Sequence, residues 1–254
     1  MRELKLIALP GIPEVARGAR LAELLCAAIA RAGLALAHGD VVVVAQKIVS
    51  KAEGRLVRLA DVTPSARALE LAQVVAKDPR LVELMLRESR EVLRAKPNVL
   101  IVEHRLGCVM AGAGVDQSNV PGAGEDACAL LLPEDPEASA RRIRQDLHDA
   151  CGVEVGVIIN DSFGRAWRNG VTGVALGVAG IPALVDRRGE PDREGRPLRV
   201  TEVAAADELA AAASLIMGQA DEGYPAVLAR GFPYALREGS VRELLRPRAE
   251  DMFR

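Results

Sequence analysis

The fold of this chain is organised around one stretch in its second half. The stretch reads Val153-Glu154-Val155-Gly156-Val157-Ile158-Ile159-Asn160-Asp161-Ser162-Phe163-Gly164-Arg165-Ala166-Trp167-Arg168-Asn169-Gly170. The β-branched apolar residues at its start are typical of a buried strand. We expect the strand to stop at Asn160, where three small polar side chains follow one another, and Gly164 to let the backbone turn.

The polar residues that end this strand suit two kinds of ligand. The Asp161 carboxylate is a hard oxygen ligand for magnesium or manganese, and the Ser162 hydroxyl follows it directly. The guanidinium groups of Arg165 and Arg168 match the geometry of phosphate oxygens. A simple Asx-turn with solvated arginines explains the same residues equally well, so this stretch alone leaves both interpretations open.

Composition restricts the class of protein. The 254 residues allow one large domain or two small ones, and a chain that is 50% hydrophobic but only 2% aromatic predicts an aliphatic core. A net charge of −2 gives no indication of a nucleic-acid partner or a membrane surface. The four cysteines form no CxxC pair, which favours reduced thiols, and we expect a cytoplasmic protein.

No segment of the sequence is expected to enter a membrane. The charged residues Arg2, Glu3 and Lys5 interrupt the first apolar residues, so we expect no signal peptide. The longest nearly apolar run, from Gly173 to Val185, contains four Gly and Pro residues and is too short to span a bilayer.

Apolar periodicity and turn residues predict the remaining elements. Strands are expected over residues 4–9, 41–44, 99–102, 107–111 and 226–229. Helices are expected over 19–32 and 203–217, from Thr63-Pro64, from Asp78-Pro79 to about Arg94, from Asp135-Pro136 to about Cys151, and from Ser240. Glycines 170, 173, 177 and 180 suit a close backbone approach at a subunit interface or beneath a ligand. Residues 186–196 predict an exposed hairpin.

Three exits from strands or helices carry acidic or amide oxygens beside glycine. They are Asp116 to Asn119, Asp161 with Ser162, and Gly218 to Glu222. With Lys47 and Lys51, which follow the valine strand, they predict a site for a metal and a nucleotide. A basic edge without a ligand is the alternative for the two lysines.

Neither the GxGxxG fingerprint nor the Walker P-loop is present, and no Ser–His–Asp or Cys–His arrangement is evident. Several motifs, in one order along the chain, instead resemble the coenzyme F420-0:L-glutamate ligase family. They are Gly11-Ile12-Pro13 and residues 49–55, 113–119, 131–133, 157–165, 172–177, 206–209 and 217–218. They span essentially the whole chain, which is far more specific than any single motif.

This resemblance implies an α+β fold, with a mixed β-sheet, flanking helices and a protruding subdomain, assembled as an intertwined homodimer. Residues 1–254 would form a single ligase domain, without the flavin-reductase-like second domain of some family members. The implied activity is GTP-dependent. L-glutamate is added through a γ-linkage to coenzyme F420-0 by way of an acyl phosphate, with no nucleic-acid or membrane partner.

The resemblance also implies a set of site residues. Those expected at the nucleotide are Ile12, Pro13, Glu14, Val15, Gln46, Lys47, Lys51, Asn119 and the loop Met217, Gly218, Gln219, Ala220, Asp221, Glu222, Gly223 and Tyr224. Those expected at two Mg²⁺ or Mn²⁺ ions, with a monovalent cation such as K⁺ nearby, are Asp116, Asp161, Ser162 and Gln219. Asp116, Asp161 and Lys51 would act in catalysis.

Gln219 departs from the family, which usually has Glu at this position. An amide oxygen can still bind a metal, but the site then carries one negative charge fewer than it would with Glu. Two other functions stay open beside the ligase. One is a metal-dependent phosphotransferase or NTP hydrolase acting on another small carboxylate. The other is a non-catalytic nucleotide-binding dimer, in which Gln219 marks a lost metal site.

Overall fold

The computed structural model describes residues 2–252, and a mixed five-stranded sheet forms its centre. The strand order is β1-β12-β2-β8-β9. The bounds are Lys5–Ala8 for β1, Val41–Ala45 for β2, Gly156–Arg165 for β8, Arg168–Ala179 for β9 and Ala226–Arg230 for β12. β2 and β8 are parallel and the other neighbours are antiparallel, so the predicted α+β class with a mixed sheet is confirmed.

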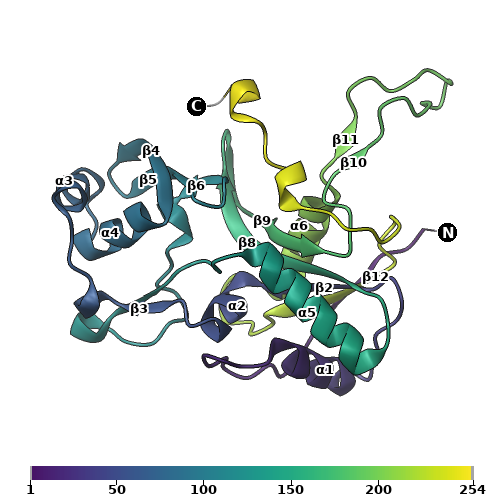
Figure 1. Cartoon of the computed structure of the whole chain (residues 1–254), viewed down its shortest axis with the longest axis horizontal. Helices are drawn as coiled ribbons and strands as arrows, with labels where there is room; N and C mark the ends of the chain where they lie inside the picture. The colour runs from purple at the N-terminus through teal and green to yellow at the C-terminus, as the bar shows by residue number, and fades with distance from the viewer. Residues whose placement is uncertain (1, 253–254) are drawn as a thin grey trace.

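Helices cover both faces of this sheet (Figure 1). On one face lie α1 (Leu21–Arg31) and α5 (Pro136–Cys151), and on the other lies α6 (Ala205–Met217). Alternate valines of β2 belong to the two different cores: 42 and 44 pack with α1 and α5, whereas 41 and 43 pack with α6. A strand buried on both faces reads as a continuous apolar run, which explains the four consecutive valines.

A second group of elements has its own hydrophobic cluster. It contains the antiparallel sheet β4 (Ser89–Lys96), β5 (Val99–His104) and β6 (Val109–Ala111), with helices α3 (Ala66–Val75) and α4 (Pro79–Arg87). These elements lie together at the left of Figure 1, away from the central sheet. The short pair β3 (Leu56–Arg58) and β7 (Cys128–Leu130) lies between them and α2 (Gln46–Ala52). Short 3₁₀ helices occupy 59–61, 112–114, 124–126, 241–243 and 248–250.

The predicted N-caps are confirmed at three helices and wrong at one. Asp78 and Asp135 accept backbone N–H groups of α4 and α5, and Ser240 caps the helix at 241–243. The helix predicted from Thr63 instead begins after Ser65, whose hydroxyl accepts the Ala68 N–H at 3.2 Å. The Glu83 carboxylate accepts the Ser65 N–H at 2.9 Å, a contact between two helices that holds Ser65 at the cap position.

The helix predicted from Pro79 to about Arg94 ends early, and this prediction was wrong at its C-terminal end. Helix α4 ends at Arg87, and residues 89–96 form β4. Val92 of this strand pairs with Val102 of β5. Pairing with a distant strand overrides the local helical pattern, because β-structure depends on cross-strand neighbours.

The strand that organises the fold is longer than expected. β8 does not stop at Asn160 but continues to Arg165, because β9 pairs along it, with Asp161 opposite Val174 and Ser162 opposite Gly173. Two of the three glycines of β9, Gly173 and Gly177, are approached by helices of the same chain, whereas nothing lies near Gly170. A Cβ on Gly173 would lie 2.4 Å from the Ala210 carbonyl oxygen of α6, and one on Gly177 would lie 2.4 Å from that of Pro136 in α5.

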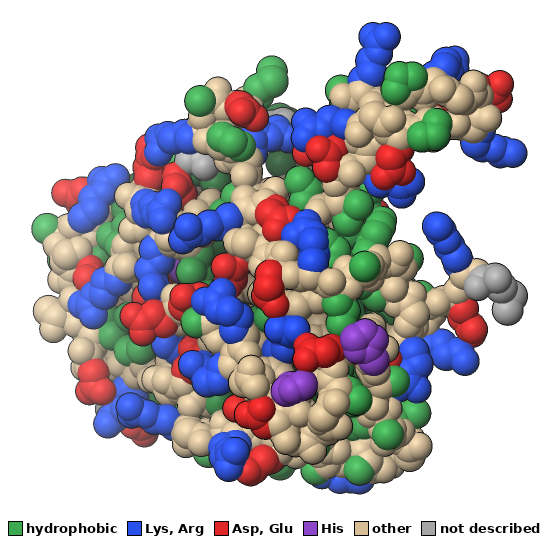
Figure 2. Space-filling model, turned by 45° about the vertical axis from the view of Figure 1, so that its right-hand side comes forward, with side chains coloured by type: hydrophobic (Ala, Val, Ile, Leu, Met, Phe, Trp, Pro, Cys, Tyr) green, Lys and Arg blue, Asp and Glu red, His purple; other side chains and the backbone are tan. Residues whose placement is uncertain are grey.

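The exposed hairpin predicted at 186–196 is part of a longer arm. Its base is the pair β10 (Val185–Asp186) and β11 (Glu202–Val203). Figure 2 shows the arm extending from the body of the molecule, with several basic side chains along it. Within residues 2–252, no helix is long and apolar enough to cross a membrane.

Candidate functional site

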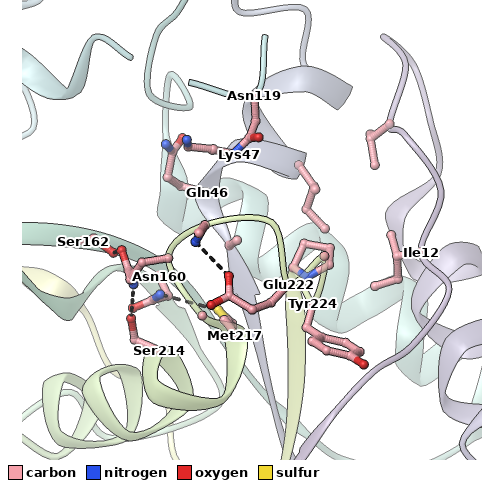
Figure 3. Close-up of a pocket in the computed structure, with 18 of the residues that line it drawn as sticks. Ile12, Gln46, Lys47, Asn119, Asn160, Ser162, Ser214, Met217, Glu222 and Tyr224 are labelled. Atoms are coloured by element: carbon pink, nitrogen blue, oxygen red, sulfur yellow. Dashed lines mark hydrogen bonds between the residues drawn. The ribbon is translucent and has the colours of Figure 1, made fainter. Parts of the chain in front are cut away.

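A cavity of about 450 Å³ lies beside the C-terminal end of β2, the start of helix α2 and the middle of β8 (Figure 3). Because β2 and β8 are parallel neighbours, residues that follow β2 lie beside residues 160–162 in the second half of β8. Two loops complete the walls, residues 12–15 after β1 and residues 217–225 after α6, and Asn119 joins them from the loop after β6. Five segments distant in sequence thus form one cavity.

Helix α2 supplies the basic side chains of the cavity. Lys47 and Lys51 are four residues apart and lie on the same side of the helix. Lys51 Nζ lies 2.5 Å from the Glu14 carboxylate, and Lys47 Nζ lies 2.6 Å from the Asp116 carboxylate. Each lysine therefore bridges α2 to a neighbouring loop through an ion pair.

Asp161 is the most deeply buried carboxylate of the cavity. Burial, together with the negative charge of Asp116, raises the pKa of Asp161 to about 6, although the Ser162 backbone, the Lys47 charge and the Gln46 side chain act in the opposite direction. The protein environment therefore disfavours the charged form of this side chain. A bound cation would offset that cost, because an opposite charge stabilises a buried carboxylate.

Two hydrogen bonds, to Ser162 and Ser214 (both labelled in Figure 3), fix the side chain of Gln219. Ser162 Oγ donates to Gln219 Oε1 at 3.0 Å, and Gln219 Nε2 donates to Ser214 Oγ at 2.9 Å. The amide oxygen of Gln219 therefore faces β8 and lies beside the residue that follows Asp161. Two positions 57 residues apart in sequence, both predicted at a metal, are in direct contact.

Asp116 does not line the cavity, but its carboxylate lies 2.6 Å from Nζ of Lys47, which does. Its carboxylate accepts hydrogen bonds from the backbone N–H of Ser118 at 2.7 Å and from the Ser118 hydroxyl at 3.1 Å. Although burial acts in the other direction, these bonds and Lys47 hold the pKa of Asp116 below its usual value. Asp116 is thus ionised and forms an ion pair with Lys47.

The loop after α6 forms one side of the cavity. Gly218 has φ +78°, and a Cβ at this position would lie 2.1 Å from the Glu222 carboxyl carbon. The backbone conformation, φ +78° and ψ 179°, is one that glycine adopts readily and other residues rarely do, whereas the exposed Glu222 side chain could move aside. The Glu222 carboxylate accepts the Ala220 N–H at 2.7 Å, and Tyr224 faces Ile12 across the opening (Figure 3).

The sequence model of the family described as F420-0:Gamma-glutamyl ligase matches residues 11–231. The chain belongs to this family. It is 49% identical over 253 residues to the coenzyme F420:L-glutamate ligase of Methanothermobacter thermautotrophicus, covering 99% of both chains. It is 42% identical over 244 residues to that of Archaeoglobus fulgidus, covering 96% of this chain and 94% of the relative. The resemblance inferred from the motifs is confirmed.

The residues that the family resemblance implies at the nucleotide all line the cavity. They come from the loop 12–15, helix α2, Asn119 and the loop 217–224. Asp161, Ser162 and Gln219 line it as well, and Asp116 is joined to it through Lys47. Their roles stay predictions, but their positions are those that one shared site requires.

The oxygen ligands predicted for a metal fit Mg²⁺ or Mn²⁺ better than zinc. Among the described residues, no group of three or more His, Cys, Asp or Glu side chains could hold a metal. The available donors are the carboxylates of Asp161 and Asp116, the hydroxyl of Ser162 and the amide oxygen of Gln219. Such an all-oxygen set is typical of hard cations that also bind substrate phosphates.

Five lining residues were not assigned to the site from the sequence. They are Ala45, Ile48, Asn160, Ser214 and Pro225. Asn160 stood in the organising stretch, and its position beside Asp161 was a usable signal. Ser214 gave none, because a serine inside an alanine-rich helix looks like any solvated position. Arg165 and Arg168, which suited phosphate, are exposed near the β8–β9 turn and do not line the cavity.

Proposed function

We propose that this protein is a GTP-dependent ligase that joins L-glutamate through a γ-linkage to coenzyme F420-0. Its family membership supports this function, since the two relatives reported above match this chain over 94% or more of their own length and are named coenzyme F420:L-glutamate ligase. The observation that carries the proposal is the single cavity in which Lys47, Lys51 and Asp161 lie together. Cations for phosphate and a carboxylate for a metal are the groups that phosphoryl transfer needs.

The proposed reaction has two steps. A carboxylate oxygen of F420-0 attacks the γ-phosphorus of GTP, the bond from this phosphorus to the β-phosphate oxygen breaks, and GDP leaves. The amine of L-glutamate then attacks the carbonyl carbon of the acyl phosphate, inorganic phosphate leaves, and the amine loses a proton. Phosphorylation is needed because a free carboxylate has no good leaving group. Later glutamates would add to the γ-carboxylate of the previous one.

The chain's own residues would act mainly by positioning and by balancing charge. Lys47 and Lys51 would donate hydrogen bonds to phosphate oxygens, exchanging their present partners Asp116 and Glu14. Preorganised donors of this kind stabilise the charge that develops in the transition state. Tyr224 and Ile12, which face each other across the opening, would bracket the nucleotide.

Divalent metal ions are part of this proposal. Asp116, Asp161, Ser162 and Gln219 would hold two Mg²⁺ or Mn²⁺ ions, with K⁺ as a further cation. Bound metal would neutralise the negative charge of the phosphates. The raised pKa of Asp161 supports this assignment. It means that the ionised carboxylate is unfavourable in the free protein, and a bound cation would stabilise that ionised form.

We also propose an intertwined homodimer in the cytoplasm, in which α3, α4 and β4–β6 form a subdomain. The separate hydrophobic cluster of those elements supports the subdomain. The arm, which extends from the body of the molecule in Figure 2, and the exposed side chains of Trp167 and Val200, 88% and 84% accessible, offer surface that a partner chain could cover. Light scattering of the purified protein tests the dimer. The four cysteines, all without a disulfide, fit a reducing compartment.

The ligase is tested with the purified protein, F420-0, L-glutamate, GTP and Mn²⁺. We expect mass spectrometry to find F420-0 extended by one or more glutamates, with one GDP released for each. GTP turnover that needs neither glutamate nor F420-0 would overturn the proposal in favour of the phosphotransferase or hydrolase. Nucleotide binding without turnover would leave only the non-catalytic dimer.

A further inference from the structure

Two thiols from opposite halves of the chain meet at the surface. Cys26 lies in α1 and Cys151 is the last residue of α5, and their sulfur atoms are 3.7 Å apart although 125 positions separate them. Figure 1 shows the C-terminal end of α5 beside α1. A disulfide bond is about 2.05 Å long, so the sulfurs need to approach by roughly a further 1.7 Å.

We propose that Cys26 and Cys151 are a modification site, at which a low-molecular-weight disulfide oxidises the two thiols to a reversible intramolecular disulfide. The local structure allows the required approach. Cys151 is exposed at a helix end, and Gly152 follows with φ +70° and nothing near the position of a Cβ. Helix ends adjust more easily than helix interiors, because their last carbonyl groups lack intrahelical partners.

The chemistry proceeds by two thiol–disulfide exchanges. The thiolate of exposed Cys151 attacks one sulfur of an oxidant such as oxidised glutathione, whose sulfur–sulfur bond breaks and releases one reduced thiol. The Cys26 thiolate then attacks the Cys151 sulfur of this mixed disulfide and releases the second reduced thiol. Overall, two protein thiols are oxidised to one disulfide, and one oxidant molecule is reduced to two thiols that carry the two protons.

Cys26 is well placed to react second. Burial, a hydrogen bond with Cys151 and the charge of Cys151 raise the pKa of Cys26 to about 11. The thiolate of Cys26 is therefore rare while Cys151 is free. Once Cys151 is part of a mixed disulfide, it carries no charge and no thiol hydrogen, so the last two causes disappear and Cys26 ionises more readily.

The other two cysteines provide an internal comparison. The Cys108 thiol donates to Met110 Sδ at 3.9 Å, and buried Cys128 donates to the Asp126 carbonyl at 3.5 Å. In the part of the chain that the structure describes, Cys26 and Cys151 are the pair whose sulfurs contact each other. Their link would join α1, which follows the cavity loop 12–15, to α5, which packs on β8 and β9.

The full-length protein is titrated with oxidised glutathione and then analysed by intact mass and non-reducing peptide mapping. We expect the loss of two hydrogen atoms and a peptide link between residues 26 and 151, both reversed by dithiothreitol. The oxidised protein should melt about 5 °C higher or more, since the link closes a long loop. Cys26→Ser and Cys151→Ser should abolish the link and the shift, and Cys108→Ser should keep both.

Several results would overturn the inference. One is a stable glutathione adduct on Cys151 without the disulfide to Cys26. Another is an intramolecular disulfide that still forms in Cys26→Ser, since it would then involve other cysteines. The third is a disulfide-linked dimer in place of the intramolecular bond. These readouts do not use GTP, glutamate or F420-0. The inference therefore stands or falls independently of the proposed ligase activity.

Discussion

Lys47 Nζ lies 2.6 Å from the carboxylate of Asp116. This ion pair joins helix α2, which follows β2 of the central sheet, to the loop that follows β6 of the second sheet. Lys47 lines the cavity, whereas Asp116 does not. A phosphate that draws Lys47 away would free the Asp116 carboxylate for a cation. A cation that binds Asp116 would in turn free Lys47 for a phosphate. Nucleotide binding and metal binding would therefore favour each other, because both need the ion pair between Lys47 and Asp116 to open.

Asp161→Asn should abolish the ligase activity. The substitution removes the buried carboxylate of the cavity and leaves a side chain of similar shape. We expect kcat to fall on the order of 10²-fold or more, the usual loss when transition-state charge stabilisation is removed. Steady-state turnover at low Mn²⁺ is the measurement, with Asp149→Asn, an exposed position on α5, as the control. Near-normal turnover would remove Asp161 from the site.

The same substitution should stabilise the metal-free fold at neutral pH. The pKa of Asp161 is raised to about 6 in the folded protein, above the ordinary value of 3.8, so between these values the folded state binds more protons than the unfolded state. The carboxylate therefore lowers the stability of the fold little at pH 4 and below, and by its full amount only well above pH 6. We expect Asp161→Asn to raise the free energy of unfolding by about 3 kcal/mol at pH 7.5, the shift of about two pKa units converted at roughly 1.36 kcal/mol each.

Urea unfolding in EDTA measures this gain at pH 7.5 and at pH 4. The gain should shrink to a small fraction at the lower pH, where the wild-type carboxyl is protonated in the folded state and close to half protonated in the unfolded state. An equal gain at both values would mean that ionisation is not its cause. Asp149→Asn again serves as the control and should change little at either pH.

Lys51→Ala should weaken the use of GTP without unfolding the protein. Only 12% of the Lys51 side chain is accessible, and its partner Glu14 also lines the cavity. Loss of one charged hydrogen bond to phosphate should lower kcat/KM for GTP about 10- to 100-fold. Initial rates over a GTP series measure this, and Lys96→Ala, on exposed β4, is the matched control. Unchanged kinetics with GTP would show that Lys51 does not contact the nucleotide.

Gln219→Glu should lower the metal concentration needed for half-maximal activity. A carboxylate here would still accept the Ser162 hydroxyl hydrogen, and the Ser214 hydroxyl can turn to donate to it. The added negative charge should tighten a divalent cation roughly tenfold, with the larger effect on the more weakly held ion. Mn²⁺ and Mg²⁺ titrations of turnover compare Gln219→Glu with the wild type and with Gln73→Glu, at an exposed position of α3. Superimposable curves for all three proteins would exclude Gln219 as a ligand.

The local parts of this protein were readable from the sequence. The valine run of β2 and the β-branched run of β8 indicated buried strands, and Asp78 and Asp135 marked the starts of two helices. These signals are local, because burial on both strand faces and side-chain capping act within a few residues. The order of the motifs along the chain also identified the family.

The tertiary structure alone decided how these parts combine. It turned residues 89–96 into a strand, because they pair with β5, and it extended β8 past Asp161, because β9 pairs along it. It also brought Gln219 to Ser162, Lys47 to Asp116 and Cys26 to Cys151. Contacts between distant residues, and the burial that raises the pKa of Asp161, depend on the packing of the whole chain. No pattern within a short stretch of sequence encodes them.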